Sequence, residues 1–303
     1  MTDGTVLPPA PAPRDPMVAA TPDTEVVSTP PDPLVSETPP ATGSAPVRLT
    51  GWPGVPLTSV SWGWRAALGL AFLALFTNAA IASLARLPGV QRLLRAGIAS
   101  LPSADRGWGL WAGVLVVSVV TYVVLLTPAL VSIRRKGAQM APALGFRPGR
   151  LWPSVGLVAA GAWIGFGVDI VYSISTAVLK LRVPNTNAEM LRAGTRSPFG
   201  LIAVFLLVAV IAPVAEEILF RGVVFSGLRD SWGEGWAIAA SSVLFGVMHL
   251  EPLLMIPTAI LGVLLAKVFS MTRSLWVPIA LHSAYNATIM GFGLLALRAA
   301  GKL

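Results

Sequence analysis

The chain has 303 residues, of which 54% are hydrophobic and only 12% are charged, and its mean hydropathy is +0.73. Soluble domains are typically about 25% charged, so this composition excludes an ordinary soluble globular protein and indicates a membrane protein. The formal net charge is +8, but the bases fall between apolar segments, which favours contact with anionic lipid headgroups over nucleic-acid binding. The chain contains no Cys, which excludes disulfide bonds, thiolate metal ligands and a Cys nucleophile.

Residues 1–60 contain 14 prolines, scattered among Thr, Ser, Ala and Asp. A segment of this composition buries too little apolar surface to order itself, so the sequence predicts a disordered Pro-rich tail. The remainder, residues 61–303, is predicted to form one membrane domain. We expect the tail to be a plain linker, and a docking arm for a partner is the alternative.

Seven apolar segments follow the tail, and most of them reach the roughly 20 residues that a bilayer-crossing helix needs. They cover residues 66–85, 108–133, 153–178, 199–220, 236–250, 252–271 and 275–297. The fifth segment is short, and Pro257 leaves open whether the sixth is one kinked helix or two pieces. The sequence therefore predicts an all-α fold, a polytopic membrane bundle of about seven to eight transmembrane helices.

The stretch AEEILFRG, residues 215–222, places three charged side chains at the end of a long apolar run. A charge near the bilayer centre costs roughly 2.5–3.5 kcal/mol even on insertion scales, so such residues are rarely without a role. Glu217 and Arg221 are spaced i, i+4 in the favourable order and are predicted to form a structural ion pair. Glu216 points about 100° away and has no local partner, which favours a functional role. Pro213 is expected to kink this helix and to free backbone groups near the site.

The chain has two histidines, and both lie in apolar segments of its last third. His249 closes the pattern Phe245-x-x-x-His249, and His282 opens the pattern His282-x-x-x-Asn286. Because residues four apart share a helix face, His282 and Asn286 can aim at one cavity. By the same spacing, the Phe245 ring is expected to form a wall of the site beside His249. A lone His in an apolar helix is usually a packing residue, but two of them together with an unpartnered Glu favour a functional site.

These residues together supply a carboxylate base, two imidazoles and an amide, and they require no hydroxyl or thiol nucleophile. A carboxylate in such a site can take a proton from water. The imidazoles and the amide can assist that water, hold a metal ion or donate to a developing oxyanion. The set therefore favours hydrolysis by an activated water and leaves those three roles open.

The ordered series Glu-Glu-x-x-x-Arg, Phe-x-x-x-His and His-x-x-x-Asn resembles the CPBP family of intramembrane proteases. This family, also called the CAAX protease or ABI family, is related to the type II CAAX prenyl endopeptidases, and the resemblance covers roughly residues 199–290. It implies an intramembrane endopeptidase in which Glu216 and His249 activate the attacking water. It also implies that His282 and Asn286 stabilise the tetrahedral oxyanion. Supporting roles fall to Glu217, Arg221 and Phe245.

The resemblance leaves the metal open, because the family is described both as metal-dependent and as a metal-free glutamate protease. We expect no required cofactor, since Asn is a poor zinc ligand but a good oxyanion donor. If a metal is bound, we expect zinc, held by Glu216, His249 and His282. The expected partners are membrane lipid and a membrane-associated or prenylated peptide or protein, with no nucleic acid. The Arg-, Ala- and Gly-rich composition suggests a multi-pass protein of a bacterial plasma membrane, acting on a bacterial peptide rather than a eukaryotic CAAX protein.

Two other classes of function compete with a protease. One is a non-catalytic membrane scaffold, or a bacteriocin-immunity-type protein, of the same family. The other is an ion- or proton-coupled transporter, which the lack of an internal repeat and the clustering of polar groups in the last third disfavour. The sequence contains neither His-Glu-x-x-His nor Gly-x-Ser-x-Gly. Asp169 has no second Asp well inside a span with which to form a dyad, and we expect it to be a structural hydrogen-bonding residue.

Overall fold

The computed structural model describes residue 1 and residues 62–100, 106–181 and 186–301. The chain divides into two units, Met1–Val47 and Arg48–Leu303, and all of the described helices belong to the second. Apart from Met1, the predicted tail lies outside the described residues, so its disorder stays a prediction.

The described residues are helical and contain no strand. In chain order the helices are α1 (Trp64–Arg86), α2 (Pro88–Ala99), α3 (Arg106–Arg135), α4 (Met140–Leu144), α5 (Leu151–Val178), α6 (Thr186–Gly194), α7 (Pro198–Leu206), η1 (Leu207–Ile211), α8 (Ala212–Glu217), η2 (Ile218–Phe225), α9 (Ser226–Trp232), α10 (Glu234–Val247), α11 (Pro252–Thr272) and α12 (Trp276–Ala299). The segments η1 and η2 are π-helical. They form one continuous run with α7, α8 and α9, the long helix Pro198–Trp232.

Six of the described helices are long and apolar enough to cross a membrane: Trp64–Leu84, Gly107–Arg135, Leu151–Val178, Pro198–Trp232, Pro252–Thr272 and Trp276–Ala299. The remaining predicted span, residues 236–250, corresponds to α10, which has 14 residues. A helix of that length is about 21 Å long, less than the roughly 30 Å thickness of a bilayer core. The predicted fold class, an all-α polytopic membrane bundle, is confirmed, and its fifth apolar segment is a shorter helix.

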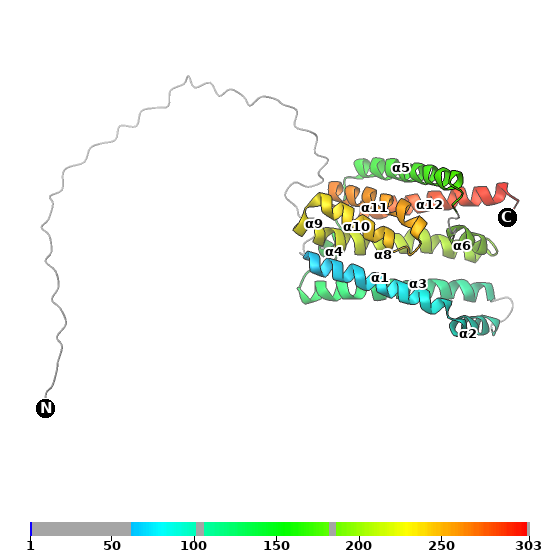
Figure 1. Ribbon diagram of the computed structural model, residues 1–303, viewed down its shortest axis with the longest axis horizontal. Helices are drawn as coiled ribbons and strands as arrows, with labels where there is room; N and C mark the ends of the chain where they lie inside the picture. Colours follow the sequence, from blue (N-terminus) through cyan, green and yellow to red (C-terminus); the bar gives the residue numbers. More distant parts are fainter. Residues whose placement is uncertain (2–61, 101–105, 182–185, 302–303) are drawn as a thin grey trace, which may run out of the picture. The chain divides into compact units, whose positions relative to one another are not determined.

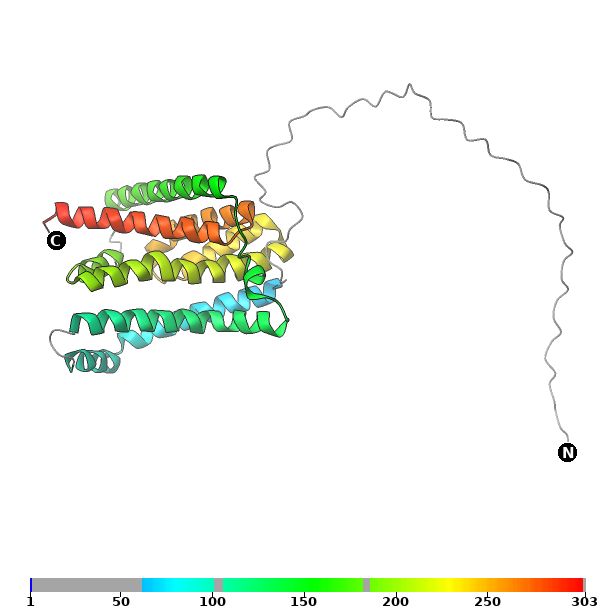
Figure 2. The ribbon, with the colours of Figure 1, turned by 180° about the vertical axis from the view of Figure 1, so that it is seen from behind.

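The long helix Pro198–Trp232 lies in the middle of the bundle. In Figure 1 and from behind in Figure 2, α1 and α3 run along one side of it, whereas α11, α12 and α5 lie on the other. The outer faces of α3 and α5 expose large apolar side chains such as Val117, Val120, Ile164 and Val171. This arrangement suits a bundle whose rim faces lipid, because lipid requires no polar surface there.

Glycines bring neighbouring helices into close contact. A Cβ atom on Gly161 would lie 2.7 Å from a Leu281 side-chain carbon, and one on Gly165 would lie 2.8 Å from the Tyr285 ring. The two glycines are four residues apart on α5, a spacing that lets membrane helices approach each other closely. Their contact holds α5 against α12. In the α10–α11 hairpin, a Cβ atom on Gly246 would lie 2.5 Å from the Met255 carbonyl oxygen, so this pair of helices is packed tightly as well.

Pro257 does not divide the sixth predicted span, which forms the single helix α11. A proline has no N–H to donate to the carbonyl four residues before it, which leaves the Leu253 carbonyl without its helical partner. The hydroxyl of Tyr172, on α5, donates a hydrogen bond to that carbonyl. A side chain from another helix thus replaces the missing backbone donor, as membrane helices require.

Candidate functional site

The first element of the site is the distorted part of the long helix. In η1 the bonds run to the fifth residue back, and the N–H of Ala212 donates to the Leu207 carbonyl. The Val208 carbonyl would need residue 213 as its donor in this register, but residue 213 is Pro and has no N–H. The side-chain amide of Asn286, on α12, donates to this carbonyl over 2.7 Å. The expectation that Pro213 frees a backbone group near the site is therefore confirmed.

The second element is a buried ion pair on the same helix. Arg221 Nη1 donates to Glu217 Oε1 over 2.7 Å, and the two side chains are 2% and 0% exposed. The other end of the guanidinium, Nη2, donates to the Gly262 carbonyl on α11 over 3.1 Å. The predicted pairing is confirmed. It has a third member, because His282 Nδ1 lies 3.0 Å from the same Glu217 oxygen.

Glu216 faces away from this pair and is partly accessible, with 22% of its side chain exposed. Its Oε2 atom lies 3.9 Å from His282 Nε2, so the two ring nitrogens of His282 face two different carboxylates. Its Oε1 atom accepts a hydrogen bond of 3.3 Å from the hydroxyl of Tyr122 on α3. We call Glu216, Glu217, Arg221 and His282 the carboxylate cluster.

Phe245 packs against both imidazoles. Its ring centroid lies 5.2 Å from that of His249 and 5.8 Å from that of His282, and both contacts are edge-to-face. The Arg221 guanidinium carbon lies 4.6 Å from the centroid of the same ring. A buried aromatic ring thus joins the cluster to the second histidine, in the position expected for a wall of the site.

His249 lies just beyond the end of α10, in the turn before α11, and is exposed. Its Nδ1 atom lies 2.9 Å from the Phe245 carbonyl. The side-chain amide of Asn78, on α1, donates to the carbonyl of the preceding residue, Met248, over 2.9 Å. Within the described part of the chain, no carboxylate lies within 4.0 Å of His249. The imidazole beside Glu216 is therefore that of His282.

Metal binding would require three of these groups to converge. Across the ranges that the structure describes, no three His, Cys, Asp or Glu side chains are placed to hold a metal ion. The proposed zinc ligands Glu216, His249 and His282 therefore do not form a ligand set in this arrangement, although Glu216 and His282 lie side by side.

The carboxylate cluster has a simple charge balance. With His282 neutral, two carboxylates and one guanidinium leave one net negative charge. Taking up one proton, on Glu216 or on His282, makes the cluster neutral. Arg221 pairs with Glu217, so Glu216 is the carboxylate of the cluster that lies outside the Glu217–Arg221 ion pair.

The structure brings together most of the predicted site residues: Glu216, Glu217, Arg221, Phe245 and His282. It places His249 at the Phe245 ring and Asn286 against the Val208 carbonyl, and the assigned roles stay predictions. Sequence reasoning missed Tyr122 and Asn78, each of which contacts a site element from a helix far away in the sequence. The available signal was a hydroxyl and an amide inside apolar spans, where polar groups usually have a partner.

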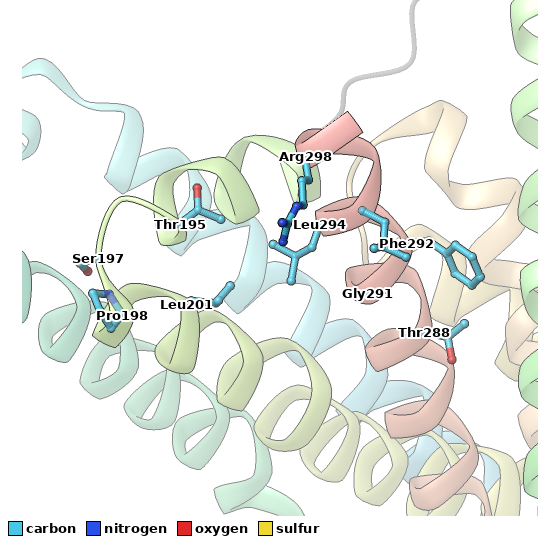
Figure 3. Close-up of a pocket in the computed structure, with 10 residues that line it drawn as sticks. Thr195, Ser197, Pro198, Leu201, Thr288, Gly291, Phe292, Leu294 and Arg298 are labelled. Atoms are coloured by element: carbon cyan, nitrogen blue, oxygen red, sulfur yellow. The ribbon is translucent and has the colours of Figure 1, made fainter. Parts of the chain in front are cut away.

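A cavity of about 990 Å³ lies elsewhere in the bundle. Figure 3 shows it between the α6–α7 connection and the last turns of α12, with Arg298 and Thr195 at one end. Leu295, in its lining, follows Asn286 by nine residues, which places the two on opposite faces of α12. The cavity is therefore separate from the candidate site.

Comparison with known proteins points to one family. Residues 198–288 match the Rce1-like family, described as type II CAAX prenyl endopeptidase Rce1-like. Over 82 residues the chain is 29% identical to a Bacillus subtilis (strain 168) protein named "Putative membrane peptidase YdiL". That alignment covers 27% of this chain and 34% of the relative, so the chain spans about a third of the length of the curated relative it matches. No solved structure matches this chain at a significant level.

The matched residues contain every motif that carried the resemblance, from the Glu pair to Asn286. They also contain the whole carboxylate cluster. Six membrane-length helices and this match make the chain a multi-pass membrane protein. Through residues 198–288, the chain is similar to the Rce1-like family of type II CAAX prenyl endopeptidases, in keeping with the resemblance that its motifs carry.

Proposed function

We propose that this protein is an intramembrane endopeptidase of the CAAX protease type, which uses Glu216 to activate a water molecule. The observation that carries the proposal is the carboxylate cluster, in which Glu216 lies outside the Glu217–Arg221 ion pair and faces His282. Glu216 is its most accessible acid, with 22% of its side chain exposed, whereas Glu217 is fully buried. Water can therefore reach Glu216, and the paired Glu217 has a supporting role.

Glu216 Oε2 and His282 Nε2 are 3.9 Å apart, so one water molecule at roughly 2.8 Å from each can contact both. In the proposed reaction Glu216 takes a proton from that water while the water oxygen bonds to the scissile carbonyl carbon. The resulting tetrahedral oxyanion then collapses, the C–N bond breaks, and Glu216 returns the proton to the leaving amine. Glu216 carries out both proton transfers in this scheme.

The oxyanion needs donors. One N–H of the Asn286 amide is bonded to the Val208 carbonyl, which fixes the amide and leaves its second N–H to donate to the oxyanion. When His282 carries a proton on both nitrogens, Nδ1–H faces Glu217 and Nε2–H is the second donor. The role proposed for His249, whose ring packs against Phe245, is to assist the water.

We propose that the reaction needs no resident metal ion. The separation of His249 from the two carboxylates supports this, as does Asn286, a poor zinc ligand whose amide donates to the Val208 carbonyl. Cysteine, the remaining common zinc ligand, is absent from the chain.

The proposed substrate is a membrane-associated peptide or protein, and the proposed location is a bacterial plasma membrane. The apolar rim of the bundle supports a substrate that approaches within or along the bilayer. The peptidase name of the Bacillus subtilis relative is consistent with this substrate class.

Cleavage of a peptide panel by purified protein in detergent tests the proposal. The panel contains prenylated CAAX peptides and membrane-bound bacterial peptides. We expect Glu216→Gln to lower the turnover number about 10²–10⁴-fold, the usual contribution of a general base. The matched control is Glu234→Gln, because Glu234 is a carboxylate of the same bundle paired with Lys267 at an exposed position. Equal cleavage by wild type and a folded Glu216→Gln variant contradicts the mechanism, and no cleavage by wild type favours the scaffold function.

A further inference from the structure

Each of the three long helices that precede the family match carries one polar side chain bonded to the candidate site or to the helix that bears it. These are Asn78 on α1, Tyr122 on α3 and Asp169 on α5. Polar groups inside a membrane are costly and are kept where they have a partner and a task. The three partners belong to the three separate sequence motifs, which makes a coincidence of packing a poor explanation.

Tyr122 acts on the Glu216 carboxylate. Its hydroxyl donates to Oε1 over 3.3 Å. A carboxylate held at one oxygen cannot rotate freely about its last bond, so the other oxygen, Oε2, stays directed towards His282 Nε2 at 3.9 Å. The bond therefore sets the direction from which Glu216 meets the water.

Asn78 acts on the turn that carries His249. Its amide donates to the carbonyl of Met248, one of the last carbonyls of α10 and its following turn. Such carbonyls have no partner within their own helix. His249 is exposed, so this tether from α1, together with its own contact to Phe245, fixes where the imidazole lies.

Asp169 acts on α12. It accepts a hydrogen bond from the hydroxyl of Tyr285, whose ring also packs against the backbone of Gly165. Tyr285 lies three residues after His282 and directly before Asn286. Because these residues are on one helix, fixing the rotation of α12 at Tyr285 also fixes the directions of the imidazole and the amide.

We propose that Tyr122, Asn78 and Asp169 are positioning residues for the reaction, so that the upstream helices hold in place the groups that the matched segment supplies. The inference rests on the proposed endopeptidase function. None of the three residues lies within residues 198–288. Their loss is expected to lower the turnover number with little change in KM, because misplacing a reacting group affects the transition state more than substrate binding.

The three tyrosines of the chain give a matched test, because each donates one side-chain hydrogen bond and each can lose its hydroxyl alone. We expect Tyr122→Phe and Tyr285→Phe to lower kcat about 10- to 100-fold, the usual cost of losing such a supporting contact, with KM changed less than about twofold. Tyr172→Phe, whose hydroxyl bonds only the Leu253 carbonyl, is the control and should stay within about twofold of wild type. For Asn78→Leu the control is Thr77→Val, because the Thr77 hydroxyl bonds its own helix at Leu73. Melting curves establish that each variant is folded.

Unchanged kcat in folded Tyr122→Phe, Tyr285→Phe and Asn78→Leu, beside an active wild type, overturns the inference and leaves the proposed function standing. An inactive wild type removes the proposed function, and the Tyr122 contact is then tested without substrate. For this we combine Tyr122→Phe with Glu216→Met and compare melting temperatures. If the melting-temperature shifts of the two single variants do not sum to the shift of the double variant, the contact is supported. If they do sum to it, the contact is overturned.

Discussion

Replacing Arg221 by Met tests how the cluster is held together. Arg221 is 1% exposed, bonds Glu217 over 2.7 Å and the Gly262 carbonyl over 3.1 Å, and lies against the Phe245 ring. Met keeps much of the volume but leaves Glu217 as a buried carboxylate without a cation. Removing one partner of a buried pair costs about 3–5 kcal/mol, and we expect a loss of about 4 kcal/mol in the free energy of unfolding.

The double variant Glu217→Gln/Arg221→Met carries the sharper expectation. Gln keeps an oxygen that can accept from His282 Nδ1 and brings no charge, so no ion is left uncompensated. Replacing both members of a buried ion pair by uncharged groups often changes stability little. We therefore expect the double variant to lose only about 1 kcal/mol in the free energy of unfolding. The second substitution is therefore expected to recover about 3 kcal/mol of the free energy of unfolding that Arg221→Met alone loses.

Reversible unfolding in mixed detergent micelles, followed by Trp fluorescence, measures these losses. Arg229→Met is the matched control on the same long helix. Arg229 is 27% exposed at the side chain and lies 3.9 Å from Asp230, so its loss should cost less than about 1 kcal/mol. The reasoning would be refuted if Arg221→Met and the double variant lost the same free energy of unfolding, or if Arg221→Met lost less than about 1 kcal/mol.

Four further outcomes are expected. Gly246→Ala should lower the free energy of unfolding by about 1–3 kcal/mol, because its Cβ would lie 2.5 Å from the Met255 carbonyl oxygen, which is backbone; an unchanged melting curve contradicts this packing. Gly161→Ala should cost less than about 1 kcal/mol in the same assay, because its Cβ meets the flexible end of Leu281 at 2.7 Å. Glu234→Gln should change stability by at most about 0.5 kcal/mol, since its ion pair is exposed, and a larger loss shows that the pair is not a surface one. Dialysis against EDTA should leave peptide cleavage within about twofold of its starting rate, whereas a loss restored by zinc contradicts the metal-free proposal.

Much of the site could be predicted because its signal is local. Glu216, Glu217 and Arg221 stand out against an apolar run, and the four-residue spacing of Glu217 and Arg221 indicated their pairing, which the structure confirms. Pro213 likewise predicted a distortion, and the structure shows two π-helical segments around it. Signals of this kind depend only on residues within two turns of one helix.

The contacts between helices could not be predicted in this way. Glu217 was assigned to Arg221 alone, yet it also meets His282, which lies 65 positions later. Tyr122 and Glu216 are 94 positions apart, and Asn78 and Met248 are 170 apart. No periodicity within a helix encodes which other helix it faces, so these partners required the fold.

The extent of the long helix also differs from the prediction. The predicted span ended at residue 220, directly before Arg221, but the helix continues to Trp232. A span predicted from hydropathy ends at such a residue because the hydropathy scale treats each charged side chain as exposed to lipid. Here the charges satisfy one another inside the bundle, and the helix can therefore pass through them.

The carbonyl freed by Pro213 has a consequence for the order of assembly during synthesis. An unpaired carbonyl in lipid costs several kcal/mol, so the long helix is incomplete until its partner arrives. The partner, Asn286, lies on α12, the last described helix, whereas Tyr172 on α5 is already made when Leu253 emerges. Domains are made from the N-terminus onwards, so the α5–α11 contact can form at once. The centre of the candidate site therefore reaches its final form only when α12, which carries His282 and Asn286, has entered the membrane.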